Sequence, residues 1–129
     1  GKLGALRGKN VAVLGLSFKP DTDDMREAPS IKIINRLLAE GAKVSAYDPK
    51  AIENAKTILG NKIKYAPTIE ECVERADCCL IVTEWAVFKE LKPEFFKSRM
   101  RRPLLIDGRR IYDAETYSEE LEFVAIGMG

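Results

Sequence analysis

Histidine is absent from the 129 residues of this chain, and cysteine occurs only three times, as Cys72, Cys78 and Cys79. Because no Cys-x-x-Cys pair is present, we expect no metal site. The lack of histidine also excludes a Ser/His or Cys/His catalytic pair, and we expect no catalytic residue in this chain. Adjacent Cys78 and Cys79 open an apolar run and are typical of small buried hydrophobes. The absence of a disulfide pattern favours a reducing, cytoplasmic setting.

An excess of charge and a long hydrophobic run are missing as well. Lys and Arg total 21 against 20 Asp and Glu, which leaves a net charge of +1. A nucleic-acid partner would leave a stronger basic excess, so we expect none, and any bound anion must be held by a local cluster. No apolar run approaches the roughly 18 residues of a membrane span, and no signal peptide is recognisable, so we expect no membrane contact.

What the chain does contain is an alternation of short β-rich runs and helical stretches. Strands are expected at residues 11–16, 43–47, 62–65, 78–83, 104–108 and 123–126. Helices are expected at residues 29–40, 51–59, 69–75, 88–100 with an interruption at Pro93, and 113–120. This pattern predicts an α/β fold, a three-layer Rossmann-like domain with a mainly parallel sheet. We assign residues 8–129 to this domain and residues 1–7 to a linker that enters it.

The loop after the first strand carries the most information, because parallel sheets bind ligands at the carboxyl ends of their strands. Only Gly15 is present where a dinucleotide-binding loop has G-x-G-x-x-G, so that motif fails. The loop, residues 17–28, supplies the cations Lys19 and Arg26 instead, and we expect some of its acids to pair with Arg26 or to lie at the start of the following helix, where carboxylates are favoured. A solvated surface loop is the alternative interpretation, although its length and position favour a functional role.

Three further strand ends supply candidate residues. Arg109 follows the fifth strand and is expected to project across the strand ends towards Lys19, where a guanidinium can bind phosphate with two hydrogen bonds. Asp107 can bind a ligand hydroxyl or orient an arginine. Trp85 more often covers a helix–sheet seam than a base or sugar. Asp48, before a proline, favours a turn over a ribose-binding role.

Together these segments resemble the C-terminal domain of the UDP-glucose and GDP-mannose dehydrogenase family. The resemblance runs from about Gly8 to the end of the chain. Its motifs, in order, are Gly15-Leu16-Ser17-Phe18-Lys19-Pro20, Thr22-Asp23-Asp24-Met25-Arg26-Glu27-Ala28-Pro29-Ser30, Ala46-Tyr47-Asp48-Pro49, Val82-Thr83-Glu84-Trp85 and Asp107-Gly108-Arg109. Each motif alone is weak evidence, but their common order and spacing make a specific pattern.

The resemblance implies an NAD-dependent enzyme that oxidises a sugar C6 alcohol to a carboxylate in two hydride transfers. Members have an N-terminal NAD-binding domain, a central dimerisation segment with the catalytic cysteine, and a C-terminal domain that grips the nucleotide diphosphate. By its motifs, this chain is similar to the third domain alone and is expected to be inactive by itself. The resemblance gives substrate contacts to Lys19 and Arg109, and a contact with NAD bound on another domain to Arg26.

Within the family, the motifs around Lys19 and Trp85 are most similar to those of UDP-glucose 6-dehydrogenases, and the full-length enzyme is expected to be a homodimer. The same domain of a GDP-mannose or UDP-N-acetylhexosamine 6-dehydrogenase is an alternative. An independent α/β interaction domain and a free-standing NAD enzyme are further alternatives. The failed glycine motif opposes the last of these.

Overall fold

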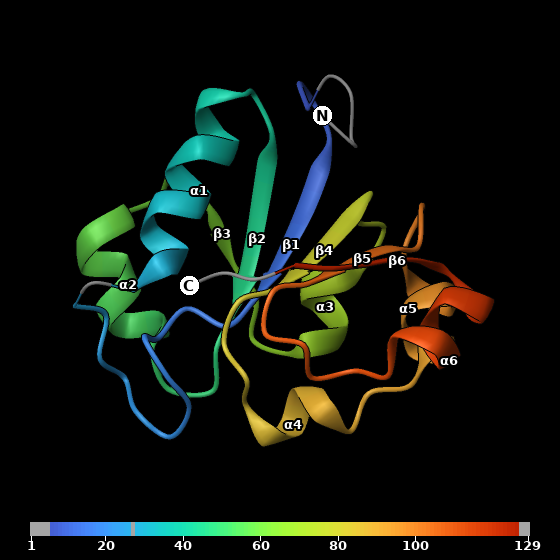
Figure 1. Cartoon of the computed structure of the whole chain (residues 1–129). Helices are drawn as coiled ribbons and strands as arrows, with labels where there is room; N and C mark the ends of the chain where they lie inside the picture. The colour runs from blue at the N-terminus through green and yellow to red at the C-terminus, as the bar shows by residue number, and fades with distance from the viewer. Residues whose placement is uncertain (1–5, 27, 127–129) are drawn as a thin grey trace.

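The computed structural model describes residues 6–26 and 28–126, and its centre is one sheet of parallel strands (Figure 1). The strands are β1 (Asn10–Leu14), β2 (Lys43–Tyr47), β3 (Lys64–Tyr65), β4 (Cys78–Ile81), β5 (Leu104–Asp107) and β6 (Glu122–Ala125). Their order in the sheet is β3-β2-β1-β4-β5-β6, and neighbouring strands pair in parallel throughout. The expected α/β fold is confirmed, and this strand order is that of doubly wound dinucleotide-binding domains.

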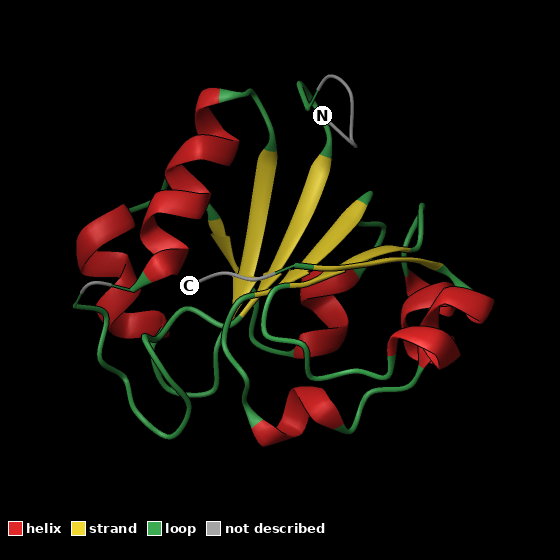
Figure 2. Ribbon diagram, in the orientation of Figure 1, coloured by secondary structure: helices red, strands yellow, loops and turns green. Residues whose placement is uncertain are grey.

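Helices cover both faces of the sheet and give the domain three layers (Figure 2). They are α1 (Pro29–Ala39), α2 (Ile52–Leu59), α3 (Ile69–Val73), α4 (Ala86–Lys89), α5 (Pro93–Arg99) and α6 (Ala114–Glu120). One apolar cluster joins the sheet to α1 and α2, and a second joins its other face to α3, α4, α5 and α6. Burial of these two clusters is the main force that holds the layers together.

Strand β1 shows why the central strands have continuous apolar sequences. Val11 and Val13 belong to the cluster under α1 and α2, whereas Ala12 and Leu14 belong to the cluster on the opposite face. All four side chains are at most 1% exposed. A strand that is buried on both faces has no place for the polar residues of an alternating pattern.

Proline and glycine set several helix ends. Pro29 begins α1, and Gly41, just beyond its end, has φ +90°, a conformation that glycine adopts without strain. Pro93 begins α5, so the helical stretch expected at residues 88–100 is two helices, with α4 ending before the proline. Thr68 caps α3 by accepting a hydrogen bond from the Glu71 amide, as the capping pattern predicts.

Among the described residues at the start of the domain, Leu6 and Gly8 contact the rest of the fold. Leu6 packs against the cluster under α1, and the Gly8 amide donates to the Gly41 carbonyl at 2.9 Å. The proposed linker, residues 1–7, falls mostly outside the described residues, so this boundary stays a prediction. Among the described residues, no helix is long and apolar enough to cross a membrane.

Candidate functional site

The carboxyl ends of three neighbouring strands, β1, β4 and β5, are joined by side-chain hydrogen bonds. After β4, the Thr83 hydroxyl donates to the Ser17 carbonyl in the loop after β1, at 2.8 Å. The next residue, Glu84, accepts from Arg109 after β5, with Nε at 3.1 Å and Nη2 at 2.6 Å from the same Oε1. The residues after β4, the middle strand, therefore fix the loops after β1 and β5. We call the region formed by these three loops the joined edge.

Lys19 and Arg109 occupy the two outer loops of this edge. Lys19 is exposed, and its carbonyl accepts from the Ser17 hydroxyl at 2.9 Å, which fixes the backbone but leaves the ammonium in solvent. The Arg109 side chain is 27% exposed and its guanidinium is directed at Glu84. The carboxylate partner was not foreseen from the sequence, and the expected approach of Arg109 to Lys19 stays a prediction.

Arg26, the third expected cation, lies farther along the β1–α1 loop. Its Nε and Nη2 each lie 3.1 Å from an oxygen of Asp24, and its side chain is 89% exposed. This pair confirms the prediction that an acid of the loop binds Arg26. The hydrogen bond from the guanidinium lowers the pKa of the Asp24 carboxyl.

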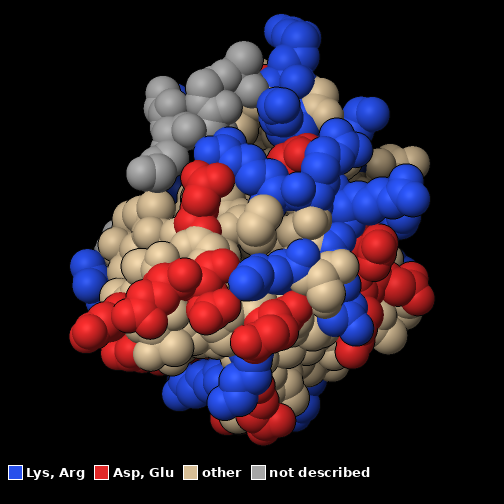
Figure 3. Space-filling view, turned by 90° about the vertical axis from the view of Figure 1, so that its right-hand side faces the viewer, with Lys and Arg blue, Asp and Glu red and all other residues tan. Residues whose placement is uncertain are grey.

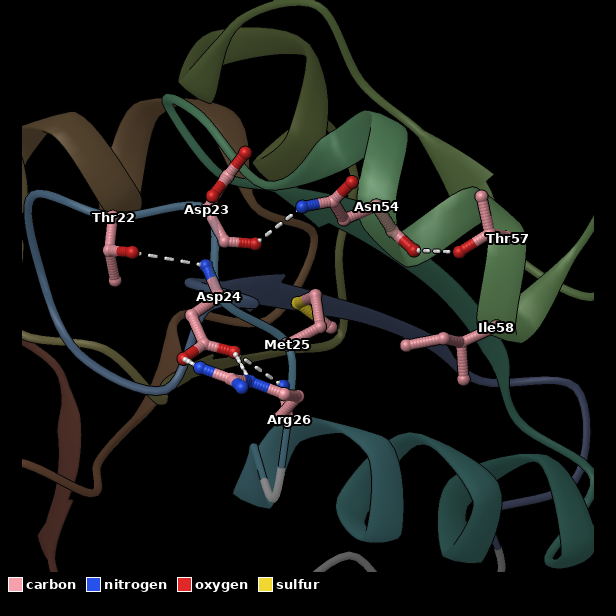
Figure 4. Close-up of a pocket in the computed structure, with 8 residues that line it drawn as sticks. All are labelled: Thr22, Asp23, Asp24, Met25, Arg26, Asn54, Thr57 and Ile58. Atoms are coloured by element: carbon pink, nitrogen blue, oxygen red, sulfur yellow. Dashed lines mark hydrogen bonds and ion pairs between the residues drawn. The ribbon is translucent and has the colours of Figure 1, made fainter.

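A hollow of about 520 Å³ lies beside this pair, between the loop and α2 (Figure 4). Asn54 of α2 closes one side of it, because its Nδ2 donates to the Asp23 carbonyl at 2.9 Å. The lining residues are Thr22, Asp23, Asp24, Met25, Arg26, Asn54, Thr57 and Ile58. Of the three candidate cations, Arg26 alone contributes to this wall, so the hollow does not unite the predicted site.

Asp48, at the end of β2, is buried and ties the β1 loop to the β4 loop. Its Oδ2 accepts from the amides of Leu16 at 2.8 Å and Ser17 at 3.0 Å, and from Trp85 Nε1 at 3.1 Å. Trp85 is 6% exposed and packs in the cluster under α3 to α6, which agrees with the seam interpretation. Sequence reasoning missed this network, since its members are 31 to 37 residues apart.

The other oxygen of the same carboxylate performs the expected turn role. Asp48 Oδ1 accepts from the amides of Lys50 at 2.9 Å and Ala51 at 2.8 Å, and so closes the turn that leads into α2. The Asp-Pro sequence therefore indicated the turn role of Oδ1. It gave no indication of the bonds that Oδ2 makes to the β1 and β4 loops.

The β1 loop does not fit a dinucleotide such as NAD in the usual manner. Such loops turn backbone N–H groups towards the pyrophosphate, but here the amides of Leu16 and Ser17 already bind Asp48. Gly15 is needed for another reason. Its φ is +103°, and a Cβ at this position would lie 2.5 Å from the Thr83 amide nitrogen and Cβ. The lone glycine permits close packing of β1 against the β4 end.

None of the three cysteines is placed for catalysis. Cys72 is 2% exposed, and Cys78 and Cys79 are fully buried, as expected for structural residues. Burial raises the pKa of Cys72 and of Cys78 to about 12, and that of Cys79 well above its ordinary value. Thiols with such pKa values stay protonated and are poor nucleophiles near neutral pH.

On the face shown in Figure 3, positive charge gathers away from this edge. Lys and Arg side chains gather in the upper part of the face shown in Figure 3, at the end of the sheet where the strands begin. Exposed cations from the segments at that end include Lys9, Lys43 and Arg101. Local placement, rather than net charge, must therefore hold any anion at the opposite edge.

Comparisons with known proteins show the family to which the chain belongs. A family model described as "UDP-glucose/GDP-mannose dehydrogenase family, UDP binding domain" matches residues 12–114. UDP-glucose 6-dehydrogenase YwqF of Bacillus subtilis is 45% identical over 127 residues, which are 98% of this chain and 29% of that protein. A UDP-glucose 6-dehydrogenase of Rhizobium meliloti is 40% identical over 125 residues, 96% of this chain and 28% of that protein.

Solved structures show the same relationship. A UDP-glucose dehydrogenase from Pyrobaculum islandicum has a TM-score of 0.79 at 32% identity, over 98% of this chain and 26% of that one. An NDP-N-acetyl-D-galactosaminuronic acid dehydrogenase from Methanosarcina mazei has a TM-score of 0.82 at 28% identity, with the same coverage. The chain spans less than a third of the length of these relatives. It belongs to the UDP-glucose/GDP-mannose dehydrogenase family, as that family's UDP binding domain.

Proposed function

We propose that this chain binds the nucleotide diphosphate of a UDP-sugar, within an NAD-dependent UDP-glucose 6-dehydrogenase that makes UDP-glucuronate. The supporting observation is the joined edge of β1, β4 and β5, which carries Lys19 on one side and Arg109 on the other. A lysine offers a mobile point charge and an arginine a planar fork of donors, and the two complement each other on a diphosphate. The similarity to UDP-glucose 6-dehydrogenases supports uridine as the base and glucose as the sugar.

The chemical step belongs to other parts of the enzyme in this proposal. The cysteines of this chain are buried and protonated, and its β1 loop does not fit a dinucleotide. NAD and the nucleophile are therefore supplied by further domains, with Arg26 reaching from the exposed loop towards NAD. The complete enzyme is proposed to be a cytoplasmic homodimer, with no nucleic-acid or membrane partner.

A second candidate substrate is an N-acetylated nucleotide sugar. The Methanosarcina mazei structure, which is that of an NDP-N-acetyl-D-galactosaminuronic acid dehydrogenase, has a TM-score of 0.82. The two candidates share the diphosphate and differ in the sugar, so the same cations serve both. Comparing UDP-glucose with UDP-N-acetylglucosamine in the same titration separates them.

Titration of the ¹⁵N-labelled chain with UDP tests the proposal. We expect saturable amide shifts around residues 17–26 and 107–111, smaller shifts with GDP, and no turnover with UDP-glucose and NAD. UMP is the matched ligand control, because it retains the base but lacks the second phosphate. A folded chain in which UDP leaves the amides of Lys19 and Arg109 unperturbed contradicts the proposal. Amide shifts of equal size with UMP and UDP would show that the second phosphate is not recognised, and would contradict the proposed binding of the diphosphate.

A further inference from the structure

Ser17 lies at the centre of the joined edge, and its amide, carbonyl and hydroxyl all make hydrogen bonds. Its amide donates to Asp48 Oδ2 at 3.0 Å, and its carbonyl accepts from the Thr83 hydroxyl at 2.8 Å. Its hydroxyl lies 2.9 Å from the Lys19 carbonyl and 3.2 Å from Asp48 Oδ2. The side chain is buried, and its single hydroxyl proton is best used on the nearer Lys19 carbonyl.

Asp48 supplies the anion around which this arrangement forms. The residue is 2% exposed, and a buried carboxylate is costly unless hydrogen-bond donors surround it. Four backbone amides and the Trp85 indole provide these donors, from three separate segments of the chain. Hydrogen bonds to an ionised group are stronger than neutral ones, so the carboxylate holds these segments firmly.

We propose that Asp48 is a positioning residue for the nucleotide-sugar site, acting on Lys19 through Ser17. The carboxylate accepts hydrogen bonds from the loop amides of Leu16 and Ser17, which in dinucleotide-binding domains would face a phosphate. These bonds fix the conformation of the loop before a ligand binds. Ser17 passes this constraint to the Lys19 backbone. The effect on ligand affinity rests on the proposed function, whereas the effect on the loop does not.

Asp77 provides a matched control at the other end of the sheet. It is 6% exposed, and its Oδ2 accepts from the Asn10 amide at 2.9 Å, at the start of β1. Its Oδ1 lies 3.9 Å from Arg101 Nε. Truncation of either aspartate removes a buried carboxylate from a backbone amide, but only Asp48 is connected to the Lys19 loop. Asp77→Ala therefore shows what the loss of a buried carboxylate does to the domain away from the Lys19 loop, and the folding check on each variant accounts for the larger number of hydrogen bonds that Asp48 accepts.

The test compares Asp48→Gly, Ser17→Ala and Asp77→Ala in the chain, each checked for folding by circular dichroism. We expect the UDP dissociation constant to rise more than about tenfold for Asp48→Gly and about threefold to tenfold for Ser17→Ala. Asp77→Ala should leave it unchanged. Formate should restore affinity to Asp48→Gly, because it returns a carboxylate to the space left by the side chain, and chloride should not.

Backbone order at Lys19, measured by ¹⁵N relaxation, gives a second readout that needs no ligand. We expect the Lys19 order parameter to fall in Asp48→Gly and Ser17→Ala, to recover in Asp48→Gly with formate, and to stay constant in Asp77→Ala. Wild-type chain that binds no UDP refutes the proposed function, yet the order parameters still decide the positioning role. Unchanged order at Lys19 in folded Ser17→Ala, or an equal fall in Asp77→Ala, overturns it.

Discussion

Arg109 and Glu84 form a close ion pair, in which two guanidinium nitrogens lie 3.1 and 2.6 Å from one carboxylate oxygen. The pair is partly exposed, with Arg109 at 27% and Glu84 at 37%. A diphosphate that binds Arg109 must share the guanidinium with Glu84 or displace it. The carboxylate therefore orients the arginine and at the same time opposes an anionic ligand.

Neutralising this carboxylate should strengthen UDP binding. In Glu84→Gln the amide oxygen still accepts from Arg109, but the negative charge beside the diphosphate is gone. We expect the UDP dissociation constant to fall about threefold or more, since a unit charge a few ångströms away contributes about 1 kcal/mol even in water. Calorimetric titration measures this, with Glu40→Gln on the distant end of α1 as control. Weaker binding in Glu84→Gln argues that orientation of Arg109 outweighs repulsion.

Removing the Lys19 ammonium should weaken UDP binding without affecting the fold. Loss of a charge-assisted hydrogen bond to phosphate costs about 1.5–3 kcal/mol, which is about 10- to 150-fold in the dissociation constant. Lys43→Ala is the matched control, because Lys43 is also exposed but lies at the start of β2. Equal affinity of Lys19→Ala and wild type, measured by calorimetry in low salt, removes Lys19 from the site.

Arg26 should affect NAD rather than UDP. In the full-length enzyme we expect Arg26→Ala to raise the KM for NAD by about tenfold, with the KM for UDP-glucose unchanged. Thermal stability should not change, because the pair with Asp24 is exposed and such pairs contribute little. Arg36→Ala is the control, since Arg36 forms a similarly exposed pair with Glu40 on α1. A selective rise in the KM for UDP-glucose instead assigns Arg26 to the substrate.

Gly15 should tolerate no side chain. Alanine there needs φ +103° and a Cβ 2.5 Å from Thr83, so the ends of β1 and β4 must separate. We expect Gly15→Ala to lower the free energy of unfolding by at least about 3 kcal/mol. Gly8→Ala is the control: its φ is +78° but its Cβ meets nothing within 4 Å, so the loss should be about 1–2 kcal/mol. Urea unfolding of both variants separates the cost of steric overlap with Thr83 from the cost of a positive φ alone. An equal loss of unfolding free energy in Gly15→Ala and Gly8→Ala would contradict the steric explanation.

Alkali should destabilise the fold through the buried thiols. Burial raises the pKa of Cys72 and Cys78 from 9.0 to about 12, so the folded state favours the protonated form. This stabilisation is complete below pH 9 and is lost between pH 9 and 12, as the thiols of the unfolded chain ionise first. Urea midpoints measured across this range should fall, and less steeply in Cys72→Ala. Rapid labelling of the native thiols by a maleimide at pH 7.5 would speak against their burial.

Secondary structure and sheet type were predictable because their signals are local. Pro29 and Gly41 bound α1 to within one residue of the expected range, since one fixes a favourable φ and the other permits a positive one. Apolar runs without alternation, such as that of β1, predicted strands buried on both faces. The three candidate cations lie in loops that follow parallel strands, where ligands commonly bind, but their role in binding stays a prediction.

The partners of these residues were not predictable. Glu84 lies 25 residues from Arg109 in the sequence, and Asp48 lies 37 residues from Trp85. Such pairs depend on the alignment of distant strands in the sheet, and no periodicity within a single segment encodes them. Asp24 and Arg26 are the contrasting case, because two residues of one loop meet whatever the rest of the chain does.

The strand order has a thermodynamic consequence for the joined edge. Its residues come from the ends of β1, β4 and β5, so no contiguous peptide of this chain contains the site. A ligand held there binds the native state and has almost no affinity for the unfolded one. Its binding then adds to the free energy of global unfolding an amount that grows with the ratio of ligand concentration to dissociation constant. We therefore expect the free energy of unfolding of this domain to rise with the concentration of the nucleotide that binds there.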